Sequence, residues 1–372
     1  MFENIYVVKP SLPPFDEYVK EIQSIWETDI LTNNGPKHEL LRKELEEYLN
    51  VNNVTLVTNG HLALELAFQG LGLTSGEVIT TPFTYISTTQ AILRSGLTPV
   101  YCDIRTDDFT LDPDGIEDLI TDKTVAIVPV HVYGNVCDVD RIQQIAEKHH
   151  LKIIYDAAHA FGETYRGKSV AQFGDVSMFS FHATKVFNTV EGGCITYTNH
   201  DDAVSFESMK QFGQILGTDR IPYMGMNAKM TEIHAAMGLC NLRHISEYIA
   251  RRKAVVERYR QRLADIPGIR LNCIQEGLES NYAYFPIIVE EKEAGITRDQ
   301  LAEALEKEHI YSRKYFYPLC SDFEVVRDMG IQAEVPVARY TADRVLTVPC
   351  YSDLAIDDVD RICDVILDCV RN

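Results

Sequence analysis

The chain has 372 residues, 45% of them hydrophobic, and its 55 acidic and 35 basic residues give a formal net charge of -20. This length and composition allow two domains with sizeable cores. The acidic balance, with no basic stretch to offset it, argues against nucleic acid and anionic membrane surfaces as partners. Nine cysteines without CxxC pairs predict reduced thiols, and neither a disulfide framework nor a metal site.

Short apolar segments alternate with helical segments from about residue 51 to residue 198. The expected strands are Val54–Thr58, Glu77–Thr81, Thr98–Cys102, Thr124–Val130, Lys152–Asp156, Val176–Phe181 and Cys194–Thr198. The expected helices between them are Leu62–Leu71, Tyr85–Ser95, Pro113–Ile120 and Asp138–His149. This alternation predicts an α/β domain with a mainly parallel sheet. Ligands of such sheets bind at the carboxyl ends of the strands.

The pattern changes after residue 198. The expected elements there are helices Asp201–Phe212 and Met230–Leu263, strand Tyr282–Val289, helix Arg298–Glu308, strand Val345–Pro349 and helix Ile356–Val370. We therefore expect a large α/β/α domain over residues 1–245 and a smaller α+β domain over residues 246–372. The sequence lacks a signal-peptide pattern and a bilayer-spanning stretch, which predicts a cytoplasmic protein.

Lys185 is the most informative residue. It follows an expected strand and a hydroxyl-rich turn, and it precedes Glu191-Gly192-Gly193. A partly desolvated lysine at a strand end loses its proton more readily and becomes a nucleophile for an aldehyde. Pyridoxal phosphate is the aldehyde that suits such a site, and its chemistry needs a carboxylate at the ring nitrogen. Asp156, at the end of another expected strand, is available for that role.

Three further strand ends carry candidate groups, each with a simpler alternative. Gly60 and His61 open a helix whose free amides suit a phosphate, whereas the simpler alternative is a tight turn. Tyr85 is placed to stack on a planar ring, or it belongs to ordinary packing. His159 is placed to reach the ring hydroxyl of the cofactor, whereas the alternative is a helix-capping Asp156 beside a surface histidine. Together with Lys185, their order along the chain favours a pyridoxal-phosphate site.

In these residues the chain resembles the DegT/DnrJ/EryC1/StrS family of sugar aminotransferases, which are fold-type I pyridoxal-phosphate enzymes. The resemblance runs from Leu31-Thr-Asn-Asn-Gly-Pro36 through Asp156-Ala-Ala-His159 and Phe179-Ser-Phe-His-Ala-Thr-Lys185 to Gly225-Met-Asn-Ala-Lys-Met-Thr-Glu232. It implies a homodimer with shared active sites.

The same resemblance implies a role for each candidate. Lys185 binds the cofactor covalently, Asp156 pairs with the pyridine nitrogen, His159 lies near the ring hydroxyl and Tyr85 stacks on the ring. The phosphate is held by the backbone at Gly60 and His61, by Ser180, and by Asn227 from the second subunit. The chain departs from the family where His61 replaces a threonine and where Lys229 replaces an arginine. The first change loses a hydroxyl contact and the second a bidentate one.

His182 resembles the residue of members that aminate carbon 4 of nucleotide-linked 4-keto sugars. The expected substrates are dTDP-4-dehydro-6-deoxyglucose and L-glutamate, in a pathway to a surface glycan such as the O-antigen of lipopolysaccharide. Candidate contacts to the sugar nucleotide are Arg313, Lys314 and Tyr317, where two cations lie among aromatic residues, and also Arg220 and Tyr223. A core strand with a solvated basic pair explains residues 311–318 equally well. Alternative functions are amination at carbon 3 and a non-catalytic ligand sensor.

Overall fold

The centre of the fold is a seven-stranded sheet in the computed structural model, which describes residues 4–371. Its strand order is β2-β10-β9-β6-β5-β3-β4. The strands are β2 (Val54–Val57), β3 (Glu77–Thr80), β4 (Thr98–Tyr101), β5 (Thr124–Val128), β6 (Lys152–Asp156), β9 (Val176–Ser180) and β10 (Gly193–Tyr197). β10 runs antiparallel to both of its neighbours, and the other pairs are parallel. The predicted mainly parallel sheet is confirmed.

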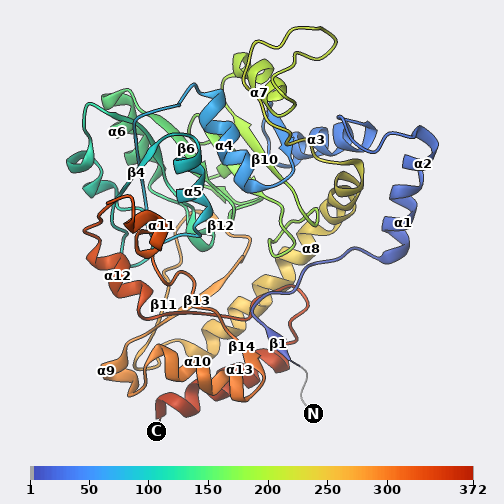
Figure 1. Cartoon of the computed structure of the whole chain (residues 1–372). Coiled ribbons are helices and arrows are strands. Elements are labelled where there is room, and N and C mark those ends of the chain that lie inside the picture. The colour runs from blue at the N-terminus through green and yellow to red at the C-terminus, as the bar shows by residue number, and fades with distance from the viewer. Residues whose placement is uncertain (1–3, 372) are drawn as a thin grey trace.

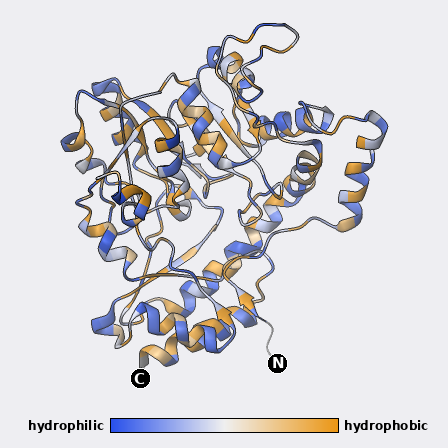
Figure 2. Ribbon diagram, in the orientation of Figure 1, coloured by the Kyte–Doolittle hydropathy of each residue, from blue (hydrophilic) through white to orange (hydrophobic). Residues whose placement is uncertain are grey.

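Helices cover both faces of this sheet (Figure 1). One face carries α4 (Gly60–Gly70), α5 (Ser87–Arg94) and α7 (Ala203–Met209), and the other carries α3 (Pro36–Tyr48), α6 (Val139–His149) and the first part of α8 (Glu232–Leu263). The strands are apolar toward both layers (Figure 2), as burial on both faces requires. In β6, Ile154 joins the core under α4, while Ile153 and Tyr155 join the opposite core. The same alternation directs Asp156 toward the α4 and α5 layer.

A second core lies at the other end of α8 (Figure 1). It contains the antiparallel sheet β11 (Ile269–Leu271), β13 (Phe285–Val289) and β15 (Val345–Val348), with α9 (Glu291–Ala294), α10 (Arg298–Lys307) and α13 (Ile356–Arg371). Ile5, near the amino terminus, joins this core because β1 (Ile5–Tyr6) pairs in parallel with β14 (Ile310–Tyr311). The domain division at residue 245 stays a prediction.

The remaining elements are short. Their bounds are α1 (Phe15–Gln23), α2 (Ile25–Thr28), β7 (Thr164–Tyr165), β8 (Lys168–Ser169), β12 (Leu278–Glu279), α11 (Glu324–Arg327) and α12 (Pro336–Ala342). The 3-10 turns are η1 (Pro113–Gly115), η2 (Glu117–Leu119), η3 (Val132–Gly134), η4 (Val170–Gln172), η5 (His200–Asp202) and η6 (Cys320–Asp322). Across residues 4–371, no helix combines the length and the apolar character needed to cross a membrane.

Three of the predicted elements need correction. The helix expected over Pro113–Ile120 is wrong, because that segment forms the two 3-10 turns η1 and η2. The helix expected over Asp201–Phe212 ends at Met209, and Phe212 has a φ of 64°, which no right-handed helix accommodates. The strand expected from Tyr282 begins at Phe285, since Tyr282 itself has a φ of 56°. The other predicted elements agree with the structure to within two residues at each end.

Candidate active site

Lys185 and Asp156 meet at one edge of the large sheet. Asp156 ends β6, and Lys185 lies in the turn after β9, the parallel neighbour in which Met178 pairs with Asp156. Parallel strands end at the same edge, so the two segments leave the sheet together. Burial lowers the pKa of the Lys185 amine, against the opposing influence of Asp156, Tyr315 and Tyr85. The lowered pKa favours the neutral amine, which is the nucleophilic form.

Asp156 is a buried carboxylate, 5% exposed. Its Oδ2 accepts a hydrogen bond from Thr88 Oγ1 at 2.7 Å, and its Oδ1 accepts one from the Ala158 N–H at 3.1 Å. Burial raises its pKa, and these hydrogen bonds together with Lys185 act in the opposite direction. A carboxylate in such surroundings is costly unless a cationic group joins it. A protonated pyridine nitrogen is such a group, so the site fits the cofactor.

His159 is fixed beside these two residues. The imidazole is 7% exposed, its Nδ1 accepts the Tyr133 N–H at 3.0 Å, and it stacks on Phe316 with ring centroids 6.0 Å apart. Nδ1 is therefore the unprotonated nitrogen. Burial, followed by the charge of Lys185, lowers the pKa of His159 well below its usual range. The alternative of a surface histidine is wrong, because the ring is part of the site wall.

A cradle suited to a phosphate lies where α4 begins. Asn59 caps the helix by accepting the Leu62 N–H at 2.9 Å, so the amides of the next two residues stay available to a ligand. A Cβ added at Gly60 would lie 2.8 Å from Cβ of Ser180, and one added at Gly193 would lie 2.8 Å from N of Gly60. Only glycine at these positions lets the backbone approach Ser180 so closely. The cradle thus brings together two of the sequence-predicted phosphate contacts.

The side chain of His61 is occupied elsewhere. Its Nδ1 lies 2.9 Å from Ser87 Oγ and its Nε2 lies 3.1 Å from Glu65 Oε1. These contacts leave the backbone amide of His61 as the group that faces the cradle. Tyr85 follows β3 and is 60% exposed, close enough to Lys185 to influence its ionisation. Its stacking on a cofactor ring stays a prediction.

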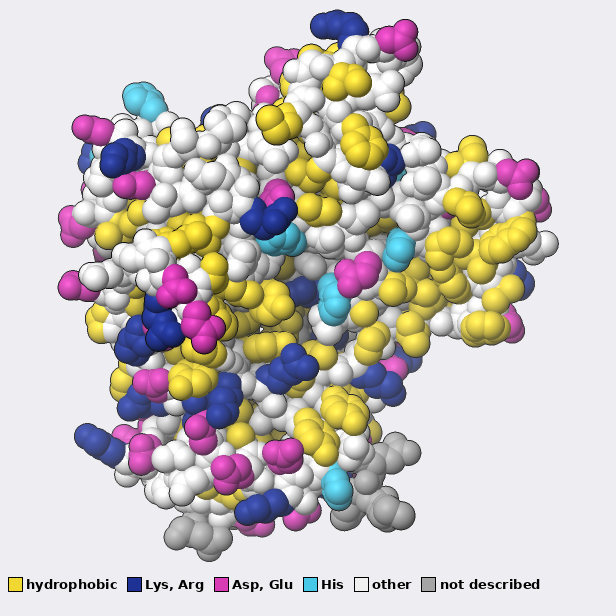
Figure 3. Space-filling model, viewed as in Figure 1, with side chains coloured by type: hydrophobic (Ala, Val, Ile, Leu, Met, Phe, Trp, Pro, Cys, Tyr) yellow, Lys and Arg dark blue, Asp and Glu magenta, His cyan; other side chains and the backbone are white. Residues whose placement is uncertain are grey.

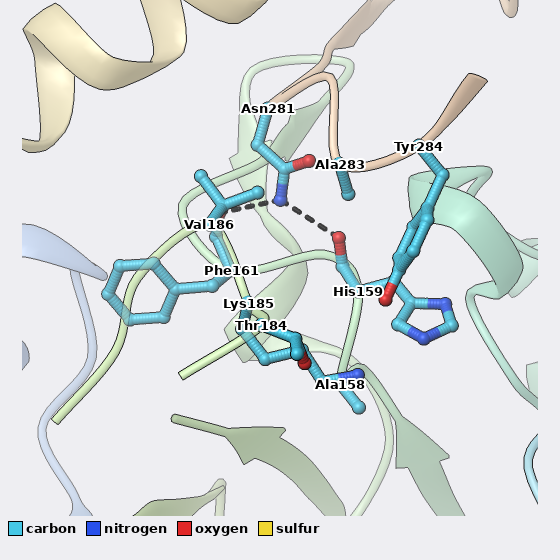
Figure 4. A pocket seen from close by; sticks show the side chains of 9 residues that line it. All are labelled: Ala158, His159, Phe161, Thr184, Lys185, Val186, Asn281, Ala283 and Tyr284. Atoms are coloured by element: carbon cyan, nitrogen blue, oxygen red, sulfur yellow. Dashed lines mark hydrogen bonds between the residues drawn. The ribbon is translucent and has the colours of Figure 1, made fainter. Parts of the chain in front are cut away.

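A small cavity of about 10 Å³ adjoins Lys185, roughly the room that one water molecule needs. It is lined by Ala158, His159, Phe161, Thr184, Lys185, Val186, Asn281, Ala283 and Tyr284 (Figure 4). Asn281 and Tyr284 come from the segment before β13, more than 90 residues after Lys185 in the sequence. Sequence reasoning missed both, and it also missed Thr88. An isolated asparagine, tyrosine or threonine carries no local signal of its partner.

His182 lies in the turn that leads to Lys185, whose N–H it accepts at 2.9 Å with its carbonyl. It is exposed, its Nδ1 lies 2.8 Å from Thr184 Oγ1, and its Nε2 lies 3.6 Å from Glu191 Oε1. The Thr184 N–H also points to Nδ1, at 3.3 Å. Nδ1 therefore acts as an acceptor and Nε2 carries the hydrogen that faces Glu191.

The predicted sugar-nucleotide residues divide into two groups. Arg313 is exposed and donates to Tyr315 Oη at 2.7 Å, and Tyr315 is one of the groups that influence Lys185. Lys314 is already paired with Asp299 at 2.8 Å, and the Tyr317 ring lies under the Arg298 guanidinium at 4.8 Å. The alternative of a core strand over residues 311–318 is wrong, since β14 ends at Tyr311.

The second group, Arg220 and Tyr223, lies on the segment after α7, which also carries Asn227, the predicted phosphate contact. Arg220 and Asn227 are exposed and Tyr223 is half-buried. Asn227 Oδ1 accepts a hydrogen bond from Lys229 Nζ at 2.7 Å, and the same ammonium lies 4.9 Å from the Phe212 ring centroid. Lys229 therefore holds Asn227 in place. The adjacent Ala228 carbonyl accepts the Thr58 N–H at 2.9 Å, so this segment passes beside the end of β2 in the same subunit. The action of Asn227 on a second subunit stays a prediction.

These features define a class of protein. The fold is layered α/β, and a lysine with a lowered pKa and a buried aspartate lie at adjacent strand ends, next to a glycine-lined phosphate cradle. This is the arrangement of a fold-type I pyridoxal-phosphate enzyme. The model of the DegT/DnrJ/EryC1/StrS aminotransferase family matches residues 15–367. The chain belongs to this family of pyridoxal-phosphate enzymes, and it is a nucleotide-sugar aminotransferase.

Similar proteins cover nearly the whole chain. A dTDP-4-amino-4,6-dideoxy-D-glucose transaminase of Shigella dysenteriae is 42% identical over 362 residues, which is 97% of this chain and 98% of that protein. The crystal structure of DesI in the presence of its TDP-sugar product has a TM-score of 0.95 and 32% identity, covering 100% of this chain and 94% of DesI. Spr1654 of Streptococcus pneumoniae in its PLP form has a TM-score of 0.91 and 28% identity, covering 99% of both chains.

Proposed function

We propose that the protein transfers the amino group of L-glutamate to carbon 4 of dTDP-4-dehydro-6-deoxy-D-glucose, giving dTDP-4-amino-4,6-dideoxy-D-glucose. The observation that carries the proposal is that Lys185 and Asp156 lie at one sheet edge, where Asp156 influences the ionisation of Lys185, in a chain 42% identical to a transaminase of that name. A role in O-antigen biosynthesis in the cytoplasm would agree with such a product and with the nine free cysteines of the chain.

The residues of the site suit this reaction. When bound, pyridoxal phosphate supplies an aldehyde that takes up an amino group and a ring that withdraws electrons. Asp156 would hold the ring nitrogen in its protonated form, and the cradle at Gly60 and Ser180 would hold the phosphate. Lys185 would hold the aldehyde carbon and, once free, move a proton to and from the reacting carbon. His159 would orient the ring hydroxyl with its Nε2, since its Nδ1 is committed to Tyr133.

The sugar nucleotide would approach the site from the side that is exposed to solvent. His182 is an exposed side chain three residues before Lys185, and the exposed Arg313 donates to Tyr315, which influences Lys185. An arginine beside an aromatic ring suits a diphosphate next to a planar base or a sugar face. Lys314 and Tyr317 would support Arg313 rather than contact the sugar nucleotide themselves. The charge of Lys314 is already paired with Asp299, and the Tyr317 ring lies under Arg298, whereas the partner of Arg313 is a neutral hydroxyl.

The active form would be a homodimer. Hydrophobic side chains gather over the arm formed by α1 and α2 (Figure 3), where Phe15 and Trp26 are 78% and 69% exposed. Met224, on the segment that carries Asn227, is 88% exposed. Large exposed apolar side chains in such number mark an interaction surface. A second copy would cover them and bring Asn227 and Arg220 to the cradle of its partner.

Product analysis tests the proposal. The purified enzyme is incubated with L-glutamate and a panel of nucleotide-linked 4-keto and 3-keto sugars, and each product is identified by NMR. We expect an amino group at carbon 4 of the dTDP sugar and a visible cofactor band that fades with glutamate and returns with the keto sugar. Amination at carbon 3, or preference for another nucleotide, would correct the substrate. Protein that takes up no cofactor would overturn the function and favour a ligand sensor.

A further inference from the structure

Glu163 is a fully buried carboxyl behind the wall of the site, with 0% exposure. Its Oε1 accepts hydrogen bonds from the Asn281 N–H at 3.1 Å and from Ser280 Oγ at 3.3 Å. Its Oε2 has no hydrogen-bond partner among the described protein groups. A Cβ added at Gly134 would lie 2.6 Å from Oε1, so the backbone of η3 closes tightly over the carboxyl. None of the contacts that shift its pKa is an ion pair, and burial raises that pKa well above its usual range.

Asn281 connects this carboxyl to the active site. Its side-chain amide donates to the His159 carbonyl at 2.9 Å and to the Phe161 carbonyl at 3.0 Å (Figure 4). The Asn281 backbone is held by Glu163, and its side chain holds the turn after β6. A single residue therefore ties the segment before β13 to the turn that carries His159. The cavity next to Lys185 is lined by both Asn281 and His159.

We propose that Glu163 is a positioning residue that acts through Asn281 to fix the main chain of His159 and the wall of the cavity beside Lys185. It has no contact with Lys185 or Asp156, and its effect on the reaction is indirect. The inference rests on the proposed function only for the identity of the ligand that His159 meets. The contacts of Glu163 and Asn281 involve protein groups only and do not depend on a bound ligand.

The need for a buried hydrogen-bond acceptor explains why a carboxyl group occupies position 163. The Asn281 N–H and the Ser280 hydroxyl are shielded from water, and a buried donor without a partner is costly. The neutral acid fills the space without burying a charge. A glutamine at position 163 keeps the accepting oxygen and the shape. A leucine keeps the approximate volume and removes the acceptor, so the Ser280–Asn281 segment loses its anchor.

The experiment compares Glu163→Gln, Glu163→Leu and Asn281→Ala in the full-length protein. Glu279→Gln is the matched control, because Glu279 lies in the same segment with its carboxylate on Thr164 at 2.9 Å, away from the cavity. The readouts are the dissociation constant of pyridoxal phosphate from the apoprotein, hydrogen exchange over residues 280–284, the midpoint of the pH titration of the visible cofactor band, and kcat and KM for the keto sugar. Thermal unfolding shows whether each variant folds.

We expect Glu163→Gln and the control to resemble the wild type in all readouts. Glu163→Leu and Asn281→Ala should each weaken cofactor binding by about tenfold, which corresponds to about 1.4 kcal/mol. Both should speed exchange over residues 280–284, shift the titration midpoint and lower kcat more than they raise KM. Because the two residues act in series, the double variant should be no worse than Asn281→Ala alone.

Two results would overturn the inference. One is a folded Glu163→Leu variant with an unchanged titration midpoint and unchanged cofactor affinity. The other is a Glu163→Gln variant as impaired as Glu163→Leu, which would show that the acceptor oxygen is not what matters. Should Glu163→Leu fail to fold, Glu163→Asp makes the same comparison, since it keeps the carboxyl and withdraws it from Asn281. Wild-type protein that binds no cofactor would refute the proposed function and leave the exchange measurement to decide this inference.

Discussion

Thr88 donates a hydrogen bond of 2.7 Å to Oδ2 of Asp156, across 68 positions of sequence. Thr88 lies in the first turn of α5, and Asp156 ends β6, so the bond joins the helix layer to the sheet edge where the active site forms. It also opposes the effect of burial on the pKa of Asp156. The hydroxyl thus favours the ionised form of the aspartate, which a protonated ring nitrogen needs.

Replacing Thr88 with valine should therefore weaken cofactor binding without creating a cavity, because valine has nearly the same shape as threonine. The pKa of Asp156 should rise further, and cofactor affinity should fall by about 1.5–3 kcal/mol, the usual worth of a hydrogen bond to a charged group. Fluorescence titration of the apoprotein with pyridoxal phosphate measures the change. Thr89→Val is the matched control, because the Thr89 hydroxyl bonds to Tyr101 at 3.1 Å and not to Asp156. Equal losses in both variants would argue against the role given to Thr88.

Lys185→Ala should bind the cofactor reversibly and fail to complete turnover. The amine is both the covalent anchor and the group that moves the proton, and loss of a general base alone costs roughly 10²–10⁴ in rate. Borohydride reduction followed by peptide mass mapping should label the peptide of Lys185 in the wild type and leave the variant unlabelled. The exposed Lys168 gives a control in Lys168→Ala. A label on another lysine would refute the assignment.

The stability of the protein should fall in acid partly because of His131. Its ring is fully buried, and burial lowers its pKa to about 3. The unfolded chain takes up a proton near pH 6.5 and the folded chain does not, so the contribution of His131 is complete above that pH and declines as the pH falls toward 3. The expected loss is about 1.4 kcal/mol for each pH unit. Urea unfolding of wild type and His131→Asn from pH 7 to pH 4.5 should show a shallower slope for the variant.

Glu232 closes the amino end of α3. Its two carboxylate oxygens accept the N–H groups of Lys37 at 2.7 Å and His38 at 2.8 Å. Glu232→Ala should lower the free energy of unfolding by about 1–3 kcal/mol, because it leaves those amides unpaired. Gly35→Ala should act in the same direction, since its Cβ would lie 2.5 Å from the Glu232 carboxyl carbon. Urea unfolding measures both changes, with Glu47→Ala at an exposed position as the control. A similar loss of unfolding free energy in the control would contradict the capping role of Glu232.

Asn227 should act on the partner subunit. Mixed Asn227→Ala and Lys185→Ala subunits, after dissociation and reassembly, should regain activity that neither variant has alone. In a mixed dimer both substitutions fall on one site and the other site is intact. Activity assays on mixtures of different ratio, with gel filtration to verify the dimer, measure the recovery. A mixture with no more activity than its components would place Asn227 on its own subunit or outside the site.

Much of the fold could be predicted because its signals are local. The strand Lys152–Asp156 was predicted with its observed ends, since an apolar run bounded by polar residues is a property of neighbouring positions. Lys185 and Asp156 could be found for the same reason, as unusual residues directly after such runs. The turns over Pro113–Leu119 could not be told from a helix, because the same residues suit both conformations and packing decides between them.

The sequence by itself determined most of the elements, the lysine, the aspartate and the helix start at Gly60, because each depends on residues within a few positions. Only the tertiary structure decided that Thr88 holds Asp156, that Asn281 holds the His159 carbonyl and that Glu163 holds the Asn281 main chain. Those contacts join positions 68 to 122 residues apart. A single threonine or asparagine offers no sign of a distant partner, and the partner appears only when burial makes each polar group find one.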